Sequence, residues 1–583
     1  MERTSNNIPI GRSANMGAAA IFLFLTILLA AGRPPYFNLA PPAFLLLFSV
    51  LITILIMRLA GTKKATLPAI LSIAGFLAVI AIWAFATQIL YDAGHDGHSY
   101  HLPAIWAFVE GWNPFLSSHD NIWVDSYPNG YWALQSYIVA MTEILLSGRA
   151  LTVGLIAAVY LLAFGFFLDR STYRSSLSQL LQAALFSAIV VANPVVLTQI
   201  MTHYVDGVIY LLGTALILFL LSDAFSGNRL TRWAAMSCII LMVNTKTASL
   251  YYVPLFVLGA LAIEWIFSDT RISRFQNLFV LIRSKGIPYG LAFFIGILLI
   301  GFKPYVTNVS DHGQFLYPSV DKIMDTNIPV NLEPLSVPMK FVYGILSRTE
   351  DSVWPVPVTA PVELKIPGSV KLFEFKDLDF DTRRGGFGPL FSLSLILALA
   401  AYAIGKLARR KNGAGIWRKE EDAFALFGFV LVGASAFFPE SWWARYIPFI
   451  WLSVFLIAYS AMRMAENGKI ISLSRILFGL VVICFVVNIA AGALGALRQS
   501  WHTYQRTAVI EQMKSFRVVE LALIEDPRTI ADHQSTLISS SDKTWTRLLE
   551  DRGVNTTIVQ EINKEECEHF GFFDGNVLWC VRK

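Results

Sequence analysis

The chain has 583 residues, of which 55% are hydrophobic and only 15% are charged, and its formal net charge is +5. Soluble domains carry about 45–50% apolar and about 25% charged residues, so an ordinary soluble enzyme is excluded. Disorder is excluded too, because a mean hydropathy of +0.55 with little net charge is the reverse of the composition of chains that cannot collapse. The composition predicts a polytopic membrane protein.

Apolar runs recur along the chain at lengths of about 16–25 residues, close to the roughly 20 that cross a hydrocarbon core about 30 Å thick. They predict an all-α membrane fold of about thirteen transmembrane helices, two of which are short. In chain order the predicted spans are 17–32, 42–61, 67–90, 150–168, 175–196, 205–221, 233–243, 250–267, 287–302, 389–405, 423–438, 447–459 and 476–497.

Lys and Arg indicate the orientation, because they collect in cytoplasmic loops. With the N-terminus inside, the inner connections carry many more of them than the outer ones, the long loop after Phe302 aside. The alternation holds only if 131–147 lies in the outer interface and does not span. We therefore expect a multi-pass protein with a cytoplasmic N-terminus and an extracytoplasmic C-terminus. The lack of a eukaryotic retention signal favours a bacterial cytoplasmic membrane, although the outward Asn-x-Ser/Thr sequons at 308–310 and 555–557 would also suit a eukaryotic lumen.

Five parts follow from this topology: two N-terminal helices (1–66), a membrane module (67–302) with the first outer loop (91–149), a second outer loop (303–388), further membrane helices (389–497) and a small outer domain (498–583). Frequent prolines predict extended, turn-rich chain in the second outer loop. The outer domain reads as α/β, with strands at 518–524, 554–559 and 577–581 and a helix from Ser541 to Gly553.

The four cysteines fall into two pairs. Cys238 and Cys484 lie in apolar spans, where a small apolar side chain is the ordinary expectation. Cys567 and Cys580 lie in the outer domain, and an oxidising compartment there predicts a disulfide between them.

The densest polar cluster follows the third span and reads Tyr-Asp-Ala-Gly-His-Asp-Gly-His-Ser-Tyr-His over 91–101. Carboxylates at a membrane surface can act as general bases or hold a divalent ion. Asp96 is the first candidate, and Asp206, at the outer mouth of the next helix pair, is the second. A carboxylate at the end of an apolar helix needs a partner or a function, although capping of the helix is the simpler explanation.

The loop from 91 to 149 is also rich in aromatic residues, among them Trp112, Tyr127 and Trp132. Aromatic faces suit sugar rings, but they equally suit an interfacial belt at the membrane surface.

Together these features resemble the glycosyltransferase-C superfamily, which includes oligosaccharyltransferase catalytic subunits, protein O-mannosyltransferases and lipid A aminoarabinose transferases. The resemblance covers about 67–267 and rests on an outer loop with an Asp, Gly-Trp-Asn-Pro at 111–114, Tyr-Pro at 127–128 and Tyr-x-Asp at 204–206. It implies that Asp96 activates or positions the acceptor and that Asp206 assists it or joins a metal site. Lys246 matches a lysine often seen at the next outer turn.

The resemblance implies attack of an acceptor hydroxyl on the anomeric carbon of a polyprenyl-phosphate or polyprenyl-diphosphate sugar, with inversion, in cell-envelope polysaccharide or glycolipid assembly. The acceptor is an extracytoplasmic glycan, lipid or protein. Cations are expected at the lipid phosphate, because Arg and Lys hold phosphate oxygens; the candidates are Arg445, Lys246, Lys303, Arg383 and Arg384. Expected substrate contacts are His95, His98, Tyr100, His101, Trp112, Tyr127, His203 and Tyr204.

A divalent cation is a further expectation, with Asp96, His98 and Asp206 as candidate ligands. The resemblance favours Mg²⁺ or Mn²⁺, whereas a set of imidazoles from His95, His98 and His101 would suit Zn²⁺ better.

Two other functions compete with the enzyme. A glycolipid transporter or flippase would place charged sites near the bilayer midplane, whereas the polar groups here gather at the outer face. A non-catalytic partner of a polysaccharide polymerase would use the outer domain as a binding module. No basic patch suited to nucleic acid occurs in the sequence.

Overall fold

The computed structural model describes residues 9–32, 41–60, 63–92, 94–171, 176–268, 273–318, 328–349, 359–376, 378–411, 419–464, 471–523, 543–574 and 577–583. Within them, nine helical runs are long and apolar enough to cross a membrane. They are α1 (Ile10–Ala31), α2 (Pro42–Ala60), α3 (Thr66–Ala86), α7 (Ala150–Leu168), α10 (Asp206–Ser226), α12 (Ser249–Ile266), the run from α13 (Arg274–Leu281) through α14 (Ile287–Ile295), α17 (Phe391–Lys411) and α20 (Ile471–Met513).

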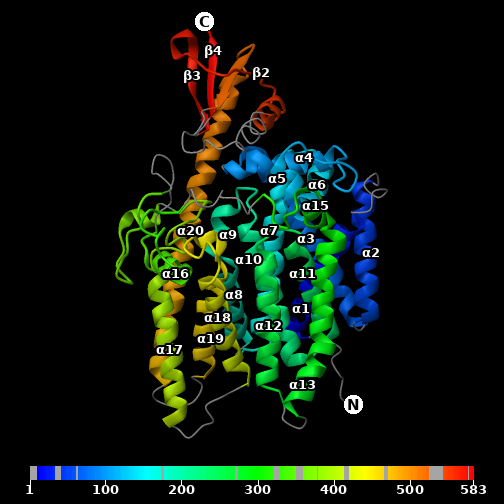
Figure 1. Cartoon of the computed structure of the whole chain (residues 1–583), viewed down its shortest axis with the longest axis vertical. Coiled ribbons are helices and arrows are strands. Elements are labelled where there is room, and N and C mark those ends of the chain that lie inside the picture. Colours follow the sequence, from blue (N-terminus) through cyan, green and yellow to red (C-terminus); the bar gives the residue numbers. More distant parts are fainter. Residues whose placement is uncertain are drawn as a thin grey trace.

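Four further helices coincide with the remaining predicted spans: α8 (Ser176–Val191), α11 (Arg229–Val243), α18 (Lys419–Ala436) and α19 (Phe449–Met464). All of them stand side by side with the nine in one bundle (Figure 1). The prediction of an all-α polytopic fold is thereby confirmed.

Two helices at the centre of the bundle are apolar and buried on every side. Nearly all of α10 and of α19 is shielded, whereas α2 and α3 leave large apolar side chains such as Leu55 and Ile82 exposed on the rim. A helix that is apolar all round belongs in a core, and close approach between such helices needs small residues. At Gly213 of α10 a Cβ would lie 2.3 Å from the ring of Phe449 in α19, so glycine permits this contact.

Short helices gather at one end of the bundle, which we call the outer end (Figure 1). They are α4 (Leu102–Val109), α5 (Ile122–Ser126), α6 (Gly130–Thr142), α9 (Pro194–Gln199), α15 (Phe302–His312) and α16 (Val337–Leu346). At 13 residues, α6 is too short to span, in line with an interfacial 131–147. Single turns of 3₁₀ or π helix occur at η2 (Lys63–Ala65), η3 (Thr87–Ile89), η4 (Gly97–His101), η5 (Ser147–Arg149), η6 (Ile282–Gly286), η7 (Gly296–Ile300), η9 (Leu372–Phe375), η10 (Ala444–Tyr446) and η11 (Lys564–Glu566).

The helix α20, with 43 residues, leaves the bundle and carries the C-terminal domain beyond the outer end (Figure 1). The domain has four strands, β1 (Val519–Leu523), β2 (Thr556–Ile558), β3 (Cys567–Asp574) and β4 (Val577–Arg582), in the order β2-β1-β4-β3. β1 and β2 are parallel, joined through a helix at 543–550, and the other pairings are antiparallel. The α/β prediction is confirmed, except that β3 was not predicted; the predicted helix start at Ser541 lies outside the described residues.

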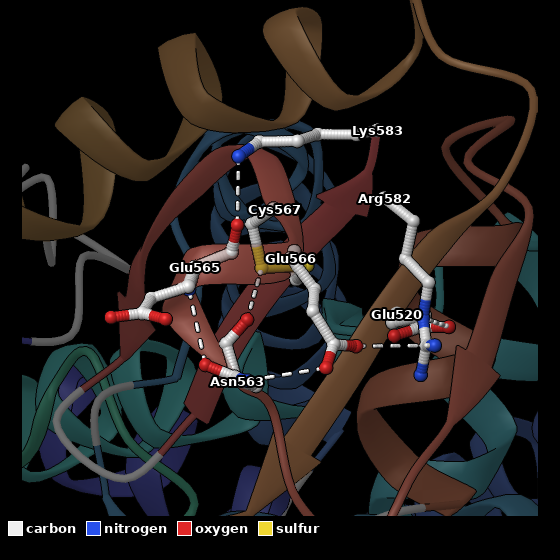
Figure 2. Close-up of a disulfide and its surroundings, with 8 residues drawn as sticks. Glu520, Asn563, Glu565, Glu566, Cys567, Arg582 and Lys583 are labelled. Atoms are coloured by element: carbon white, nitrogen blue, oxygen red, sulfur yellow. Dashed lines mark hydrogen bonds and ion pairs between the residues drawn. A yellow bond between two sulfur atoms is a disulfide. The ribbon is translucent and has the colours of Figure 1, made fainter.

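Cys567 and Cys580 form a disulfide between the neighbouring strands β3 and β4, with their Cα atoms 5.5 Å apart (Figure 2). This is the pair expected from the sequence. Beside it, Arg582 of β4 binds Glu520 of β1 at 2.7 Å, so an ion pair joins β1 to the two strands that the disulfide links. Cys238 and Cys484 are free and buried in the bundle.

The C-terminal domain packs on the first outer loop. The hydroxyl of Thr544 donates to the carbonyl oxygen of His98 at 2.8 Å, and the ring of Trp545 lies 4.2 Å from the His98 ring. Trp545 and Phe573 share one apolar cluster with Tyr91 of the loop. The loop and the domain therefore have a common core.

Removal of the disulfide by joint Cys567→Ala and Cys580→Ala substitution should destabilise the C-terminal domain by about 2–4 kcal/mol, because the unfolded loop regains its freedom. Limited proteolysis of the full chain in detergent measures this as faster cleavage within 543–583. The Cys238→Ala variant, altered in the bundle, serves as the control. Equal cleavage rates in both variants would contradict the expectation.

Candidate active site

The candidate site centres on the guanidinium of Arg445, which lies within ion-pair distance of three carboxylates. Nη1 is 3.6 Å from Oδ2 of Asp96 and 3.7 Å from Oδ2 of Asp206, and Nε is 3.1 Å from Oδ1 of Asp381. Arg445 is only 9% exposed. In such a setting ion pairs are screened little by water, so they hold their partners firmly.

Each charged group comes from a different segment at the outer end of the bundle. Asp96 precedes η4, Asp206 is the first residue of α10, Lys246 follows α11, and Arg445 lies in η10 between α18 and α19. The segment before α17 supplies Asp381. Backbone hydrogen bonds join that segment to η10, because Ala444 N donates to Arg383 O at 3.0 Å and Arg445 N to Thr382 O at 3.2 Å.

Asp206 has a second cation, because the Lys246 ammonium contacts its Oδ1 directly. Its other oxygen accepts a hydrogen bond of 3.4 Å from the Gln199 amide, whose own oxygen accepts from Gly207 N at 2.8 Å. As the first residue of α10, the carboxylate also meets the positive end of a helix dipole. Asp206 is 3% exposed, and these partners offset the desolvation cost of its buried charge.

Aromatic rings enclose the two central cations. The Arg445 guanidinium lies 4.6 Å from the Trp443 ring and 5.1 Å from both Tyr204 and Tyr446, and the Lys246 ammonium lies 4.6 Å from Tyr446. Such cation–π contacts strengthen when water is excluded. The rings thus keep the cations desolvated and immobile.

The network fixes the charge states of its members. Burial disfavours a charge on Asp96, but His95 and Arg445 outweigh it and hold the pKa of Asp96 well below its usual range. Burial likewise opposes the charge of Arg445, yet Asp381, Asp206 and Asp96 raise its pKa. Burial lowers the pKa of Lys246 despite the attraction of Asp206. Asp96 is therefore a carboxylate, and a weak base, for as long as His95 and Arg445 stay beside it.

Behind the site, Asp92 and His203 join the two segments that carry Asp96 and Asp206. Nδ1 of His203 lies 2.5 Å from Oδ2 of Asp92, and both side chains are fully buried. The backbone N of His203 and that of Gly94 also donate to Asp92, at 2.8 and 2.7 Å. Burial opposes the charge of Asp92, but the hydrogen bond of His203 lowers its pKa to about 2. The pair acts as an internal brace, away from solvent.

Two glycines allow the loop to close over this brace. A Cβ at Gly97 would lie 2.2 Å from the Asp92 carboxylate, and a Cβ at Gly94 would lie 2.3 Å from the Tyr204 ring. Since neither approach tolerates a side chain, the glycines on both sides of Asp96 set its position.

The structure distributes the other expected substrate contacts around the centre. His95 is exposed, and Tyr100 stacks near Trp123. The rings of Tyr100, Tyr127 and Trp132 contact one another, with centroids 5.8–6.2 Å apart. Nδ1 of His101 accepts a hydrogen bond of 2.6 Å from Trp132 Nε1, and the indole N–H of Trp112 donates to Ser117 O. His98 packs under the C-terminal domain, and His203 braces Asp92.

The expected phosphate-binding cations separate into two groups. Arg445, Lys246 and Arg383 converge, and Arg383 binds Asp381 at 2.7 Å and stacks on Trp443 at 4.1 Å. Lys303 pairs with Asp125 of α5 instead, and Arg384 is 1% exposed.

The donor groups do not fit a divalent cation. In the part of the chain that the structure describes, no three His, Cys, Asp or Glu side chains converge as metal ligands. Arg445 lies between Asp96 and Asp206, so a protein cation already stands where a shared metal would have to bind. The third metal candidate, His98, faces Trp545.

Sequence reasoning missed Asp381, Gln199 and the role of Asp92. Asp381 lies in a proline-rich loop, and only its place two residues before Arg383 signalled a charged cluster. Asp92 was visible as the start of Asp-x-Gly, a spacing in which a carboxylate accepts from the backbone two residues on.

Acid should destabilise the fold partly through His203. Burial lowers the pKa of His203 below its usual 6.5, so the unfolded chain binds a proton that the folded chain refuses, and stability falls as pH falls below about 6.5. A His203→Asn variant should lose less melting temperature between pH 7.5 and 5.5 than wild type, measured in detergent. His502→Asn, at an exposed ring of α20, should keep the wild-type slope. Identical slopes for all three proteins would contradict this role.

No protein-family model and no curated relative matches the sequence. Among solved structures, the chain is similar to ArnT from Cupriavidus metallidurans in the apo state, with a TM-score of 0.41 and 11% identity over 84% of this chain and 86% of that one. It is also similar to the same protein bound to undecaprenyl phosphate, with a TM-score of 0.38 and 11% identity over 87% and 97%. ArnT is a lipid A aminoarabinose transferase of the glycosyltransferase-C fold. At such TM-scores the likeness carries no weight for the chemistry, which rests on the site itself.

Proposed function

We propose that the chain is a membrane glycosyltransferase that moves a sugar from a polyprenyl-phosphate or polyprenyl-diphosphate donor to an extracytoplasmic hydroxyl in cell-envelope assembly. The cluster of Asp96 and Asp206 with Arg445 and Lys246 carries the proposal. It combines groups that can take a proton with groups that can hold a phosphate. It also lies at the end of a membrane bundle, where a lipid-borne donor can reach both.

In the proposed reaction, Asp96 takes the proton of the acceptor hydroxyl, and the hydroxyl oxygen bonds to the anomeric carbon. The bond from that carbon to the phosphate oxygen breaks, and its electron pair leaves with the polyprenyl phosphate. One displacement inverts the anomeric centre. Arg445 and Lys246 stabilise the charge that grows on the phosphate, and Asp206 holds Lys246 in place.

Binding of the donor also prepares the base. A phosphate that engages Arg445 competes with Asp96 for the guanidinium, which together with His95 holds the pKa of Asp96 low. As the contact weakens, the pKa rises and Asp96 becomes a better proton acceptor. Donor occupancy and the base strength of Asp96 are thus coupled through Arg445, while the contribution of His95 remains.

The placement of charge argues for chemistry over transport. In α10, at the centre of the bundle, the charged side chains lie near the helix ends: Asp206 at the outer end and Asp223 near the other. A transporter would need such groups near the midplane. The excess of Lys and Arg in connections opposite the site supports a cytoplasmic N-terminus and an extracytoplasmic site in a bacterial cytoplasmic membrane.

Asp96→Asn should lower kcat about 10²–10⁴-fold by removing the base, while KM for the donor should not rise, because the phosphate no longer competes with a carboxylate for Arg445. The assay follows release of polyprenyl phosphate from a panel of polyprenyl-phosphate hexoses, pentoses and aminopentoses by the protein in proteoliposomes, with cell-envelope glycan and glycolipid fractions as acceptors. Asp120→Asn, an exposed carboxylate of the same loop, is the matched control and should retain full activity. Wild-type turnover by Asp96→Asn would refute the catalytic role.

Arg445→Lys should lower kcat/KM for the donor about 10²–10³-fold, because one charge remains but the planar, forked donor set is lost. The matched control is Arg463→Lys, at a similarly shielded arginine near the opposite end of the bundle that pairs with Glu420 at 3.7 Å. An equal loss in both variants would indicate a structural effect and not phosphate binding.

A further inference from the structure

Several large apolar side chains stand out from the proline-rich outer loop just before α17. Leu372 is 84% exposed and Ile366 is 79% exposed, with Val370 and Phe373 exposed between and beside them. We call these four residues the apolar tip. Apolar groups that cluster on a surface outside the spans mark an interaction site.

The apolar tip is held rigidly by a buried ionic hub. Glu374, with no exposed side-chain area, binds Lys365 at 2.5 Å and Arg348 at 3.1 Å, and accepts from the backbone N of Lys371 at 2.9 Å. Lys365 also donates to the carbonyl oxygen of Pro389 at 2.6 Å. The contact between Lys365 and Glu374 joins the two ends of the segment 366–373. The side chains of the tip therefore point away from this contact and stay exposed.

The tip lies beside the outer end of a membrane-spanning helix. Gly368, with φ +90°, turns the chain so closely over the first turn of α17 that a Cβ there would touch Leu393 at 3.4 Å. Farther along α17, Ile396 and Leu399 are exposed on the lipid-facing surface of the bundle. Figure 1 shows this loop at the periphery of the molecule, above α17. The exposed apolar surface therefore continues from the helix onto the tip.

Basic residues border the same surface. Lys371 and Lys376 are exposed. The Lys371 ammonium pairs with Glu363 at 3.0 Å and lies 5.6 Å from the ring of Phe373. Apolar side chains flanked by lysines are the composition of segments that lie in the membrane interface, where the lysines reach the lipid head groups.

We propose that the apolar tip inserts into the outer leaflet of the membrane, at the boundary between head groups and acyl chains. The occupant is a lipid surface, because the tip extends the lipid-facing surface of α17, and the exposed Lys376 beside it is a cation that anionic head groups attract. From the tip the chain reaches Asp381 and Arg383 within about a dozen residues. One segment thus touches both the lipid and the candidate site.

The test places a fluorophore at the tip of the full chain in nanodiscs of phosphatidylcholine and phosphatidylglycerol. A background with Cys238→Ala and Cys484→Ala keeps the disulfide and receives Leu372→Cys or, as a second variant, Ile366→Cys, labelled with the environment-sensitive dye NBD. Two labelled variants calibrate the signal: Ile396→Cys on the lipid-facing side of α17, and Phe572→Cys, 61% exposed in the C-terminal domain.

Doxyl-labelled lipid should quench the dye at Leu372→Cys and Ile366→Cys at least half as strongly as at Ile396→Cys, whereas aqueous iodide should quench mainly at Phe572→Cys. Quenching of the tip by iodide alone would overturn the proposal, since the tip would then face water. Quenching by neither agent would also overturn it, because another protein surface would then cover the tip. None of these readouts depends on transferase activity.

Discussion

The ion pairs of Arg445 are the constraint on which the outer end of the molecule depends. They join the first outer loop, the start of α10 and the segment before α17 to the turn between α18 and α19. A buried charge without a partner is costly, often by several kcal/mol. If one of these segments left the cluster, the remaining buried charges would lose a partner. The site is therefore held together by ion pairs between segments, and not by a single rigid element.

A second, tighter layer supports the first. The Asp92–His203 pair offers no exposed surface and lies between the same two segments that present Asp96 and Asp206. Gly94 and Gly97 lie next to this pair. Because they have no side chains, the loop can pack closely against the Asp92 carboxylate and the Tyr204 ring. The Arg445 cluster can exchange partners with a ligand while the Asp92–His203 pair keeps the backbone still. This division suits a site in which recognition requires a charged side chain to change partners.

The membrane fold was predictable because its signal is length and hydropathy, which do not depend on tertiary contacts. Asp96 and Asp206 could be singled out as candidates for a different reason: they are carboxylates in an apolar chain whose orientation does not require them. Asp381 was not predictable, because its significance comes only from Arg445, some sixty residues away in the chain. The partner of Lys303 was not predictable either: it pairs with Asp125, and no pattern in the sequence links those two positions. Strand β3 was not predicted, because its Gly and charged residues do not give a strand pattern; it forms a strand by pairing with β4.

The docking of the helix at 543–550 on the first outer loop has a consequence for biosynthesis. The loop around His98 leaves the ribosome and crosses the membrane early, whereas Thr544 and Trp545, which cover it, are made more than four hundred residues later. Until then the loop's apolar residues lack their cover, although the bundle around them can already be inserted. Domains generally form in the order of synthesis, but here the outer face is completed only from the far end of the chain. Nascent chains would therefore carry an open, uncovered form of the loop through most of their assembly.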